Sequence, residues 1–327
     1  MKIMFYDTKP YDKIWFQPLG EEMGYKIKFQ EVKLNEDTAI LAKNYNAVCI
    51  FVNDDVGKET IKALKELGVR TILLRCAGFN NVDLKAAKEA DIKVLRVPSY
   101  SPEAVAEYAM GLLLTVNRNI HRAYVRTRDF NYNINGLMGI DLVGKTVGVI
   151  GTGKIGQMMI DILKGFKMHI LAYDPYPVKG LDAEYVDLDR LFREADVISL
   201  HCPLTKDTRH IINKKNIEKM KDGVLLVNTS RGGLINTGDL IEALMARKFA
   251  GVGLDVYEEE DEYFFEDKSN DIITDEDLIR LTSFRNVILT SHQAFFTRDA
   301  MEAIAKVTME NARAVEEGAE LKNQVLP

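Results

Sequence analysis

Short apolar runs and stretches of helical spacing alternate along the first third of the chain. The runs that resemble buried strands lie at 3–6, 47–52, 71–76 and 94–97. Between two of them, the segment 58–67 places Ile61, Leu64 and Leu67 on one face of a helix. Alternation of strands and helices over about a hundred residues predicts a small α/β domain with a parallel sheet.

A second series of strands begins at Thr146. Its first apolar run, 147–150, is followed by residues with helical spacing and then by a strand-like run that ends at Asp174. Further runs typical of strands, separated by helical stretches, lie at 196–201, 224–228, 251–255 and 287–290. This alternation is what a doubly wound parallel sheet requires, so the series predicts a second α/β domain.

Two helices lie outside these series. Ser101 and Pro102 are typical of a helix start, with an N-cap residue followed by proline at the first helical position. The residues up to Arg128 are apolar nearly all round and then become basic, which predicts one mostly buried helix that passes between domains or into a subunit interface. A last helix, 298–318, follows the final strand, and we expect it to return to the first domain.

These elements predict an α/β protein with two doubly wound parallel-sheet domains. A Rossmann NAD-binding domain, residues 100–297, is expected to be inserted into a discontinuous flavodoxin-like substrate domain formed by 1–99 and 298–327. The dinucleotide-binding domain is not the N-terminal one, because its first strand begins only at Thr146.

Composition narrows the class of protein. The 327 residues are 46% hydrophobic and 28% charged, and the net charge of −6 with scattered lysines and arginines argues against nucleic acid as a partner. Cys49, Cys76 and Cys202 have neither disulfide nor metal-ligand spacing, so we expect buried thiols, a reducing compartment and no metal. The chain begins without a signal-peptide core, and its longest apolar stretch, 108–116, is too short to span a bilayer. We therefore expect a cytoplasmic protein without a membrane partner.

Gly151, Gly153 and Gly156 follow the strand at 147–150 in GxGxxG spacing. In such a motif the first glycine allows a tight turn, the second lets the backbone approach a pyrophosphate, and the third lets the helix pack closely on the strand. The helix N-terminus offers N–H groups to phosphate. Asp174 suits a ribose hydroxyl pair and would repel a 2′-phosphate, which favours NAD over NADP. A turn that merely needs glycines is the alternative.

Strand ends carry the candidates for chemistry, because ligands bind at the carboxyl ends of strands in open α/β sheets. Arg231 follows the run 224–228, where it could clamp a carboxylate and polarise a carbonyl, or pair with an acid in a structural role. His292 follows 287–290 and could give a proton to a carbonyl oxygen as hydride arrives at carbon. His201 also ends a strand and is its competitor.

The remaining titratable candidates are less distinctive. His121 and His210 have polar neighbours and are expected at the surface, and His169 lies within a strand. Glu260 is one of several consecutive acids, and a solvated face is one interpretation. In contact with the histidine, it would favour imidazolium and keep that group a competent acid near neutral pH. Asp255, at the end of its strand, is better placed to meet the nicotinamide side of a cofactor.

Nine segments spread almost end to end resemble the D-isomer-specific 2-hydroxyacid dehydrogenases, and among them the fermentative NAD-dependent D-lactate dehydrogenases. They are CAGFNNVD (76–83), VPSYSPEAVAEYA (97–109), NRNIHRAYVRTRD (117–129), GKTVGVIGTGKIG (144–156), DVISLHCPLT (196–205), VNTSRGGLI (227–235), LDVYEEE (254–260), FFEDKSND (264–271) and SHQAF (291–295). Such a set is far more specific than any one motif, and the resemblance implies the same discontinuous domain.

The resemblance implies a role for each matching residue. Arg231 would hold the substrate carboxylate and carbonyl, His292 would be the general acid/base, and Glu260 would be its carboxylate partner. The substrate would also meet the N–H groups of Ala77 and Gly78, the hydroxyl of Tyr100, and the side chains of Phe51 and Phe295. NAD would meet Lys154 and Ile155 at its pyrophosphate, Asp174 at its ribose, Cys202, Pro203 and Thr208 along the cleft, and Thr229, Ser230 and Asp255 nearer the nicotinamide.

The activity that the resemblance implies is reversible reduction of pyruvate to D-lactate by NADH. Two alternatives stay open, namely a dehydrogenase for a larger 2-keto acid such as 2-ketoisocaproate and a non-catalytic NAD-sensing protein. Phe51 argues against a dicarboxylate, which would want a second cation in the pocket. We also expect a homo-oligomer, with the apolar helix from Pro102 suggesting a dimer and the resemblance a tetramer.

Overall fold

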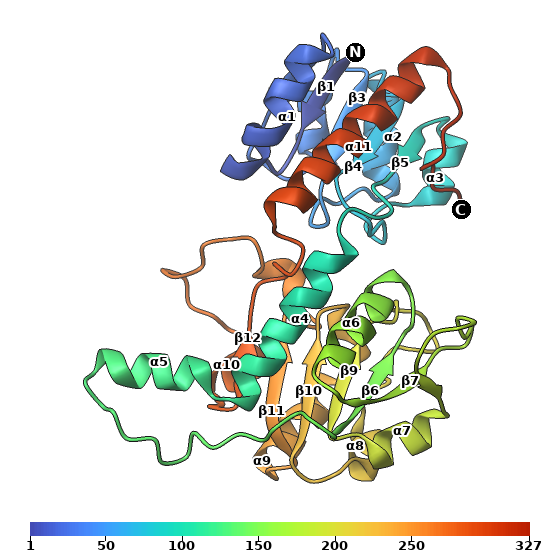
Figure 1. The fold of residues 1–327 in the computed structure, drawn as a ribbon. Helices are drawn as coiled ribbons and strands as arrows, with labels where there is room; N and C mark the ends of the chain where they lie inside the picture. Colours follow the sequence, from blue (N-terminus) through green and yellow to red (C-terminus); the bar gives the residue numbers. More distant parts are fainter. The chain divides into compact units, whose positions relative to one another are not determined.

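The computed structural model describes residues 1–327, which divide into two compact units (Figure 1). Unit 1 consists of Met1–Ser101 and Phe296–Pro327, and unit 2 of Pro102–Phe295. Unit 1 is therefore discontinuous in sequence, and unit 2 is inserted into it.

Unit 1 is built on a five-stranded parallel sheet in the order β2-β1-β3-β4-β5, the order of flavodoxin-like folds. Its strands are β1 Lys2–Phe5, β2 Lys26–Phe29, β3 Ala47–Ile50, β4 Thr71–Leu74 and β5 Lys93–Leu95. Its helices are α1 Pro10–Glu22, α2 Lys58–Glu66, α3 Leu84–Glu89 and α11 Arg298–Glu317. The strand order reverses between β1 and β3, so their carboxyl ends border the place where such sheets bind ligands.

The elements of unit 1 that are absent from the sequence prediction include β2, α1 and α3. β2 is an edge strand whose residues alternate between exposed and half-buried, so it offers no apolar run. α1 contains Pro18, which normally ends a helix, yet the helix continues and buries Phe16. α11 packs against α1 and β4, so the last helix of the chain completes this unit (Figure 1).

Unit 2 contains a seven-stranded parallel sheet in the order β12-β11-β10-β9-β6-β7-β8. Its strands are β6 Thr146–Ile150, β7 His169–Tyr173, β8 Glu184–Tyr185, β9 Val197–Leu200, β10 Val224–Asn228, β11 Phe249–Leu254 and β12 Val287–Leu289. Its helices are α4 Pro102–Asn117, α5 Ile120–Arg128, α6 Lys154–Gly165, α7 Leu188–Glu194, α8 Lys214–Lys219, α9 Thr237–Met245 and α10 Glu276–Ser283. Counted from β6, this is the Rossmann order with one further edge strand, and the predicted fold class is confirmed.

The prediction of one helix from Ser101 to Arg128 is wrong. α4 ends at Asn117, Asn119 adopts a left-handed conformation with φ of 50°, and α5 then begins at Ile120. Asparagine tolerates this conformation better than most residues, so the chain can turn there. α4 packs on α6, β10 and β11, and its apolar faces are buried within unit 2 itself. No helix of the chain is both long and apolar enough to cross a membrane.

Candidate active site

The glycine turn joins β6 to α6 in unit 2. Gly151 has φ of 97°, and a Cβ added there would overlap the backbone of Cys202. A Cβ at Gly156 would overlap the carbonyl oxygen of Gly151. Gly153, the N-cap of α6, would have no heavy atom within 4 Å of an added Cβ. The fold itself thus requires Gly151 and Gly156. Gly153 instead borders open space, as the close approach of a pyrophosphate to the backbone requires.

This difference predicts opposite effects for two single-methyl substitutions. Gly156→Ala should destabilise the protein by about 1–3 kcal/mol, because the added methyl group overpacks the turn. Gly153→Ala should leave thermal unfolding without NADH nearly unchanged, because its methyl group meets no protein atom. In the complex with NADH, the methyl group of Gly153→Ala should clash with the phosphates. This clash should weaken NADH binding by about 5- to 150-fold. Fluorescence titration with NADH checks this, and wild-type affinity in Gly153→Ala would contradict the placement of the pyrophosphate.

Asp174, just after β7, is fixed beside the glycine turn. Its Oδ2 accepts the backbone N–H of Thr152 (2.7 Å), and its Oδ1 accepts that of Tyr176 (2.8 Å). Each carboxylate oxygen keeps a further lone pair that a ribose hydroxyl can use. Lys154 and Ile155 begin α6 directly after the turn. The structure therefore brings the predicted pyrophosphate and ribose residues together.

Five of the other predicted cofactor residues follow β9 or β10, which are neighbouring strands, and Asp255 follows β11. Ser230 donates from Oγ to the carbonyl oxygen of Cys202 (2.7 Å), and Thr208 donates from Oγ1 to that of Pro203 (2.6 Å). Burial raises the pKa of the Cys202 thiol to about 11, so the thiol is neutral near pH 7. Thr229 is buried, and its Oγ1 has no hydrogen-bond partner. A buried hydroxyl of this kind is costly unless a ligand or water satisfies it, which fits a cofactor here.

His201 is a weak competitor for proton transfer. Its Nε2 lies 2.8 Å from Oγ of Ser199. Burial lowers the pKa of His201 to about 4. The imidazole is therefore neutral near pH 7 and a poor proton donor.

Arg231 stands in the turn after β10, and this turn is shaped by Asn228. The fully buried Asn228 donates from Nδ2 to the carbonyl oxygen of Arg231 (2.8 Å) and accepts the N–H of Ser230 (3.0 Å). Arg231 donates from Nη1 to the carbonyl oxygen of Ser230 (2.7 Å). Gly232 packs so closely on the backbone of Tyr257 that a Cβ would not fit. Asn228 is missing from the sequence prediction, although an asparagine that ends an apolar strand is a visible signal.

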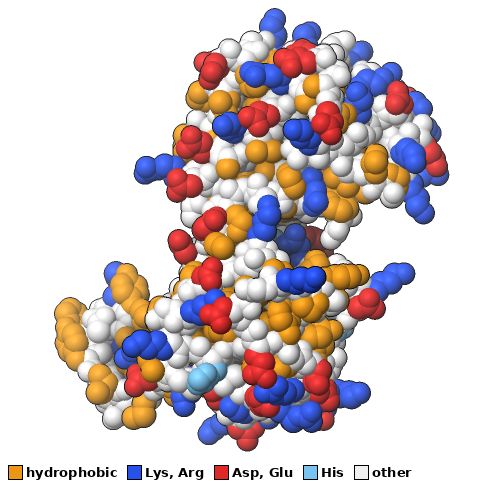
Figure 2. All heavy atoms as spheres, turned by 45° about the vertical axis from the view of Figure 1, so that its right-hand side comes forward, with side chains coloured by type: hydrophobic (Ala, Val, Ile, Leu, Met, Phe, Trp, Pro, Cys, Tyr) orange, Lys and Arg blue, Asp and Glu red, His pale blue; other side chains and the backbone are white.

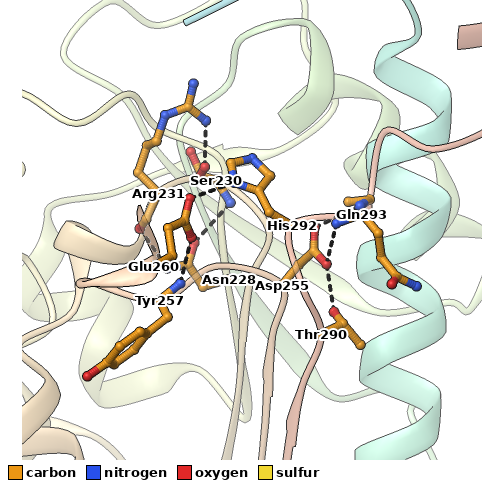
Figure 3. A network of polar contacts seen from close by, with 10 residues as sticks. Asn228, Ser230, Arg231, Asp255, Tyr257, Glu260, Thr290, His292 and Gln293 are labelled. Carbon is orange, nitrogen blue, oxygen red and sulfur yellow. Dashed lines mark hydrogen bonds and ion pairs between the residues drawn. The ribbon is translucent and has the colours of Figure 1, made fainter. Parts of the chain in front are cut away.

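His292 and Glu260 form a close pair after β12 and β11 (Figure 3). Nδ1 of His292 lies 2.6 Å from Oε1 of Glu260, and Oε2 of Glu260 accepts the N–H of Tyr257 (2.9 Å). The two side chains are 20% and 17% exposed, so the pair is sheltered but reachable. The carboxylate occupies Nδ1, which leaves Nε2 as the ring nitrogen that can face a substrate. Arg231 lies in the same group of side chains (Figure 3).

Asp255 supports the turn that carries His292. Its Oδ1 accepts from Oγ1 of Thr290 (2.6 Å) and N–H of Gln293 (2.9 Å), and its Oδ2 accepts from N–H of Ala294 (2.7 Å). Its carbonyl oxygen accepts from the N–H of His292 (2.7 Å). Burial raises the pKa of the Asp255 carboxyl, and these hydrogen bonds oppose that shift. They also hold His292 at φ of 54°, a conformation uncommon outside glycine.

His210 and His121 are both partly exposed, as the expected surface position requires, but each also contacts a residue far along the chain. Nε2 of His210 lies 2.5 Å from Oε1 of Glu258, and its side chain is only 29% exposed. His121 is half-buried, with Nε2 3.1 Å from the carbonyl oxygen of Arg285. Polar neighbours in sequence did not reveal these contacts, because the partners lie far along the chain.

Four of the predicted substrate residues belong to unit 1. Phe51 follows β3 and is buried, and Ala77 and Gly78 follow the adjacent strand β4 and are half-buried. Tyr100 lies at the end of the first segment of unit 1 and is half-buried. Phe295, the fifth, is buried at the last position of unit 2.

The loop that carries Ala77 and Gly78 is held by its neighbours. Arg96 donates from Nη1 to the carbonyl oxygen of Ala77 (2.9 Å), and its guanidinium carbon lies 5.1 Å from the ring centroid of Phe79. The Cys76 thiol donates to the carbonyl oxygen of Gly78 (3.3 Å). The carbonyl groups of Ala77 and Gly78 therefore both accept hydrogen bonds, and these bonds fix the backbone of the loop.

Unit 2 therefore combines a glycine turn typical of dinucleotide binding with an imidazole held by a carboxylate, a group that can donate a proton. Reduction of a carbonyl needs a hydride at carbon and a proton at oxygen, and these two features provide for both. The combination defines a nicotinamide-dependent dehydrogenase.

Comparisons with known proteins narrow this class. Residues 110–294 match the family model for the D-isomer specific 2-hydroxyacid dehydrogenase, NAD binding domain. The chain is 53% identical to D-lactate dehydrogenase of Escherichia coli (strain K12), with 100% of both chains covered. It superimposes on the pyruvate reductase of Chlamydomonas reinhardtii with a TM-score of 0.94 at 40% identity, over 99% and 98% of the two chains. For D-2-hydroxyisocaproate dehydrogenase the TM-score is 0.89 at 31% identity, with both chains fully covered. The chain belongs to the D-isomer-specific 2-hydroxyacid dehydrogenases and is an NAD-dependent oxidoreductase.

Proposed function

We propose that the protein is a D-lactate dehydrogenase that reversibly reduces pyruvate with NADH. The contact of 2.6 Å between His292 and Glu260 carries this proposal, because it supplies a positioned proton donor in the NAD-binding unit. The relative that is 53% identical over both complete chains is a D-lactate dehydrogenase, which supports pyruvate as the substrate.

NAD supplies or accepts the hydride when it is bound. The start of α6, with Lys154 and Ile155, would hold its pyrophosphate, and Asp174 its adenosine ribose. Cys202, Pro203 and Thr208 would lie along the cofactor, and Thr229, Ser230 and Asp255 nearer its nicotinamide. The orphaned hydroxyl of Thr229 and the open space at Gly153 support this assignment.

Three side chains of the protein carry out the proposed proton transfer and stabilise the charge that develops on the substrate. His292 donates a proton from Nε2 to the carbonyl oxygen of pyruvate, and takes it back in the reverse direction. Glu260, on the other ring nitrogen, orients the imidazole and favours its charged form. Arg231 binds the substrate carboxylate and stabilises the negative charge that develops on the carbonyl oxygen.

Unit 1 is proposed as the substrate domain. The predicted bounds, 1–99 with 298–327 for the substrate domain and 100–297 for the NAD-binding domain, lie within two residues of the bounds of the two units. The N–H groups of Ala77 and Gly78 would bind the substrate carboxylate, with the Tyr100 hydroxyl beside them. Phe51 and Phe295 would line the pocket for the methyl group. The placement of Phe51, Ala77 and Gly78 after neighbouring strands supports this.

The experiment that tests the function is NADH consumption with a panel of 2-keto acids. Pyruvate is expected to have the highest kcat/KM. A larger acid such as 2-ketoisocaproate is the second candidate, because the fold also matches D-2-hydroxyisocaproate dehydrogenase. No turnover of any keto acid, with NADH bound normally, would instead favour a non-catalytic NAD sensor.

Glu260→Gln is expected to lower kcat by about 10- to 150-fold. The charge-assisted contact with His292 is worth about 1.5–3 kcal/mol, and each 1.36 kcal/mol is tenfold in rate. Glu259→Gln is the matched control, because this neighbouring acid is exposed. Steady-state kinetics compare the two variants, and equal activity in both would argue against a role for Glu260.

We infer further that the chain forms a homo-oligomer, a dimer or tetramer. α5 and the loop after it project from unit 2 and carry hydrophobic side chains on their surface (Figure 2). The exposed large hydrophobic residues there are Ile120, Tyr124, Val125, Phe130, Tyr132, Ile134, Met138, Ile140 and Val143. Surface of this kind is typical of protein interfaces.

Buried thiols suit a reducing cytoplasm, where reoxidation of NADH by pyruvate would serve fermentation.

A further inference from the structure

Phe51 is held at both ends of its backbone by residues of unit 1. Asp54, which is 1% exposed, accepts the N–H of Phe51 at Oδ2 (2.6 Å) and that of Leu34 at Oδ1 (2.5 Å). Asn81 donates from Nδ2 to the carbonyl oxygens of Phe51 (2.9 Å) and Asp54 (2.8 Å). A carboxylate and an amide thus fix the peptide groups on either side of the Phe51 ring.

Arg75 fixes the ring itself. Its guanidinium carbon lies 4.8 Å from the centroid of the Phe51 ring and 4.6 Å from that of the Phe5 ring. Arg75 is 3% exposed and donates from Nη2 to the carbonyl oxygen of Asp7 (2.7 Å). The carboxylate of Asp12 lies 3.5 Å from its Nε. A buried, anchored guanidinium stacked on two rings leaves little freedom to either of them.

These contacts lie at the carboxyl ends of the strands, where sheets of this kind bind ligands. Phe51 follows β3 and Arg75 follows the adjacent strand β4. Arg75 and Asn81 also stand on either side of the Ala77–Gly78 turn in sequence. Arg75 and Asn81 therefore connect Phe51 to the loop that is proposed to bind the substrate carboxylate.

We propose that Arg75, aided by Asp54 and Asn81, is a positioning residue that holds the Phe51 ring fixed and thereby determines which 2-keto acid side chains the enzyme accepts. This inference rests on the proposed function, in which Phe51 lines the pocket for the substrate side chain. A fixed ring accommodates the methyl group of pyruvate and resists a branched chain. If the Phe51 ring loses its contact with Arg75, the ring can move and make room for a branched substrate side chain.

The test is Arg75→Lys, which keeps the positive charge among the neighbouring carboxylates and removes the planar surface that stacks on Phe51. Arg70→Lys is the matched control at the opposite end of β4. There the side chain is exposed and donates to the backbone carbonyls of Lys65 and Val69. Both variants are assayed as full-length enzyme with saturating NADH, pyruvate and 2-ketoisocaproate.

Arg75→Lys is expected to lower the ratio of kcat/KM for pyruvate to that for 2-ketoisocaproate by about tenfold or more, within the range that pocket contacts contribute to discrimination. The change should come from the KM values of the two acids, with the KM for NADH unchanged. Arg70→Lys should keep the wild-type ratio. In a Phe51→Ala background, Arg75→Lys should change the ratio no further, because the ring that it positions is gone.

A folded, active Arg75→Lys enzyme with the wild-type ratio would overturn the inference. A purely structural role predicts that result, since lost stability reduces the amount of active enzyme without altering its selectivity. If Arg75→Lys does not fold, Asn81→Ala, which removes a half-buried amide, decides by the same ratio. Failure of the proposed function shows separately, as absence of turnover by the unchanged enzyme, and would overturn the inference with it.

Discussion

His292→Asn is expected to lower kcat for pyruvate reduction by about 10²- to 10⁴-fold, the contribution of a positioned general acid. Without the imidazole, the proposed site lacks its positioned acid as hydride reaches the carbon. Asparagine is the appropriate replacement, because His292 has φ of 54° and asparagine tolerates that conformation. Steady-state kinetics measure the loss, and titration with NADH should show cofactor affinity close to that of the wild type.

The chain provides a close control for this substitution. His210 has φ of 53° and also contacts a glutamate, with Nε2 2.5 Å from Oε1 of Glu258. His210→Asn therefore removes an imidazole from the same backbone conformation and the same kind of partner. It should retain most of the wild-type kcat. Similar losses in both variants would indicate a general effect on folding and would contradict the role given to His292.

Arg231→Gln is expected to lower kcat/KM for pyruvate by about 10²- to 10³-fold, the effect of removing one group that stabilises a developing oxyanion. The loss should also appear as a higher KM, because the same guanidinium is proposed to bind the substrate carboxylate. Arg231→Lys should recover only part of the activity, since an ammonium keeps the charge but not the planar pair of donors.

Arg209→Gln is the control for the arginine substitutions. Arg209 is 56% exposed and pairs with Glu258, so its replacement removes a surface cation of the same size from the same unit. Exposed pairs of this kind contribute about 0–1 kcal/mol to stability, and kcat/KM should change little. An Arg231→Lys enzyme as active as the wild type would contradict the need for a guanidinium in the site.

The dinucleotide-binding turn could be predicted from sequence because its residues are close neighbours along the chain. Gly151, Gly153 and Gly156 lie within one turn, and the strand and helix around them have clear apolar periods. Asp174 ends the next strand, where a carboxylate of this kind is expected. Local spacing carries this information, and the structure adds only that Gly153 alone borders open space.

The pairing of charged groups could not be predicted, because it depends on residues far apart in sequence. Glu258, Glu259 and Glu260 are consecutive, yet the first contacts His210, the second is exposed and the third contacts His292. The positions of Asn228 and Asp255 are similarly set by the turns that they support. Only the packed structure distinguishes these polar residues from others nearby.

His201 and His292 show how environment decides between equivalent positions. Both follow strands of the same sheet, and spacing alone leaves them as competitors. Burial lowers the pKa of His201 to about 4, whereas His292 faces a carboxylate.

The break between α4 and α5 could not be predicted from the helical pattern either. The left-handed conformation of Asn119 interrupts a run of residues with that pattern.

Chiral analysis of the product is the most direct test of the central claim. The purified full-length protein would be incubated with pyruvate and excess NADH, and the lactate enantiomers separated and quantified. The proposed function predicts D-lactate alone, formed in equal amount to the NADH consumed. L-lactate, a racemic product, or no product from a protein that binds NADH would contradict it.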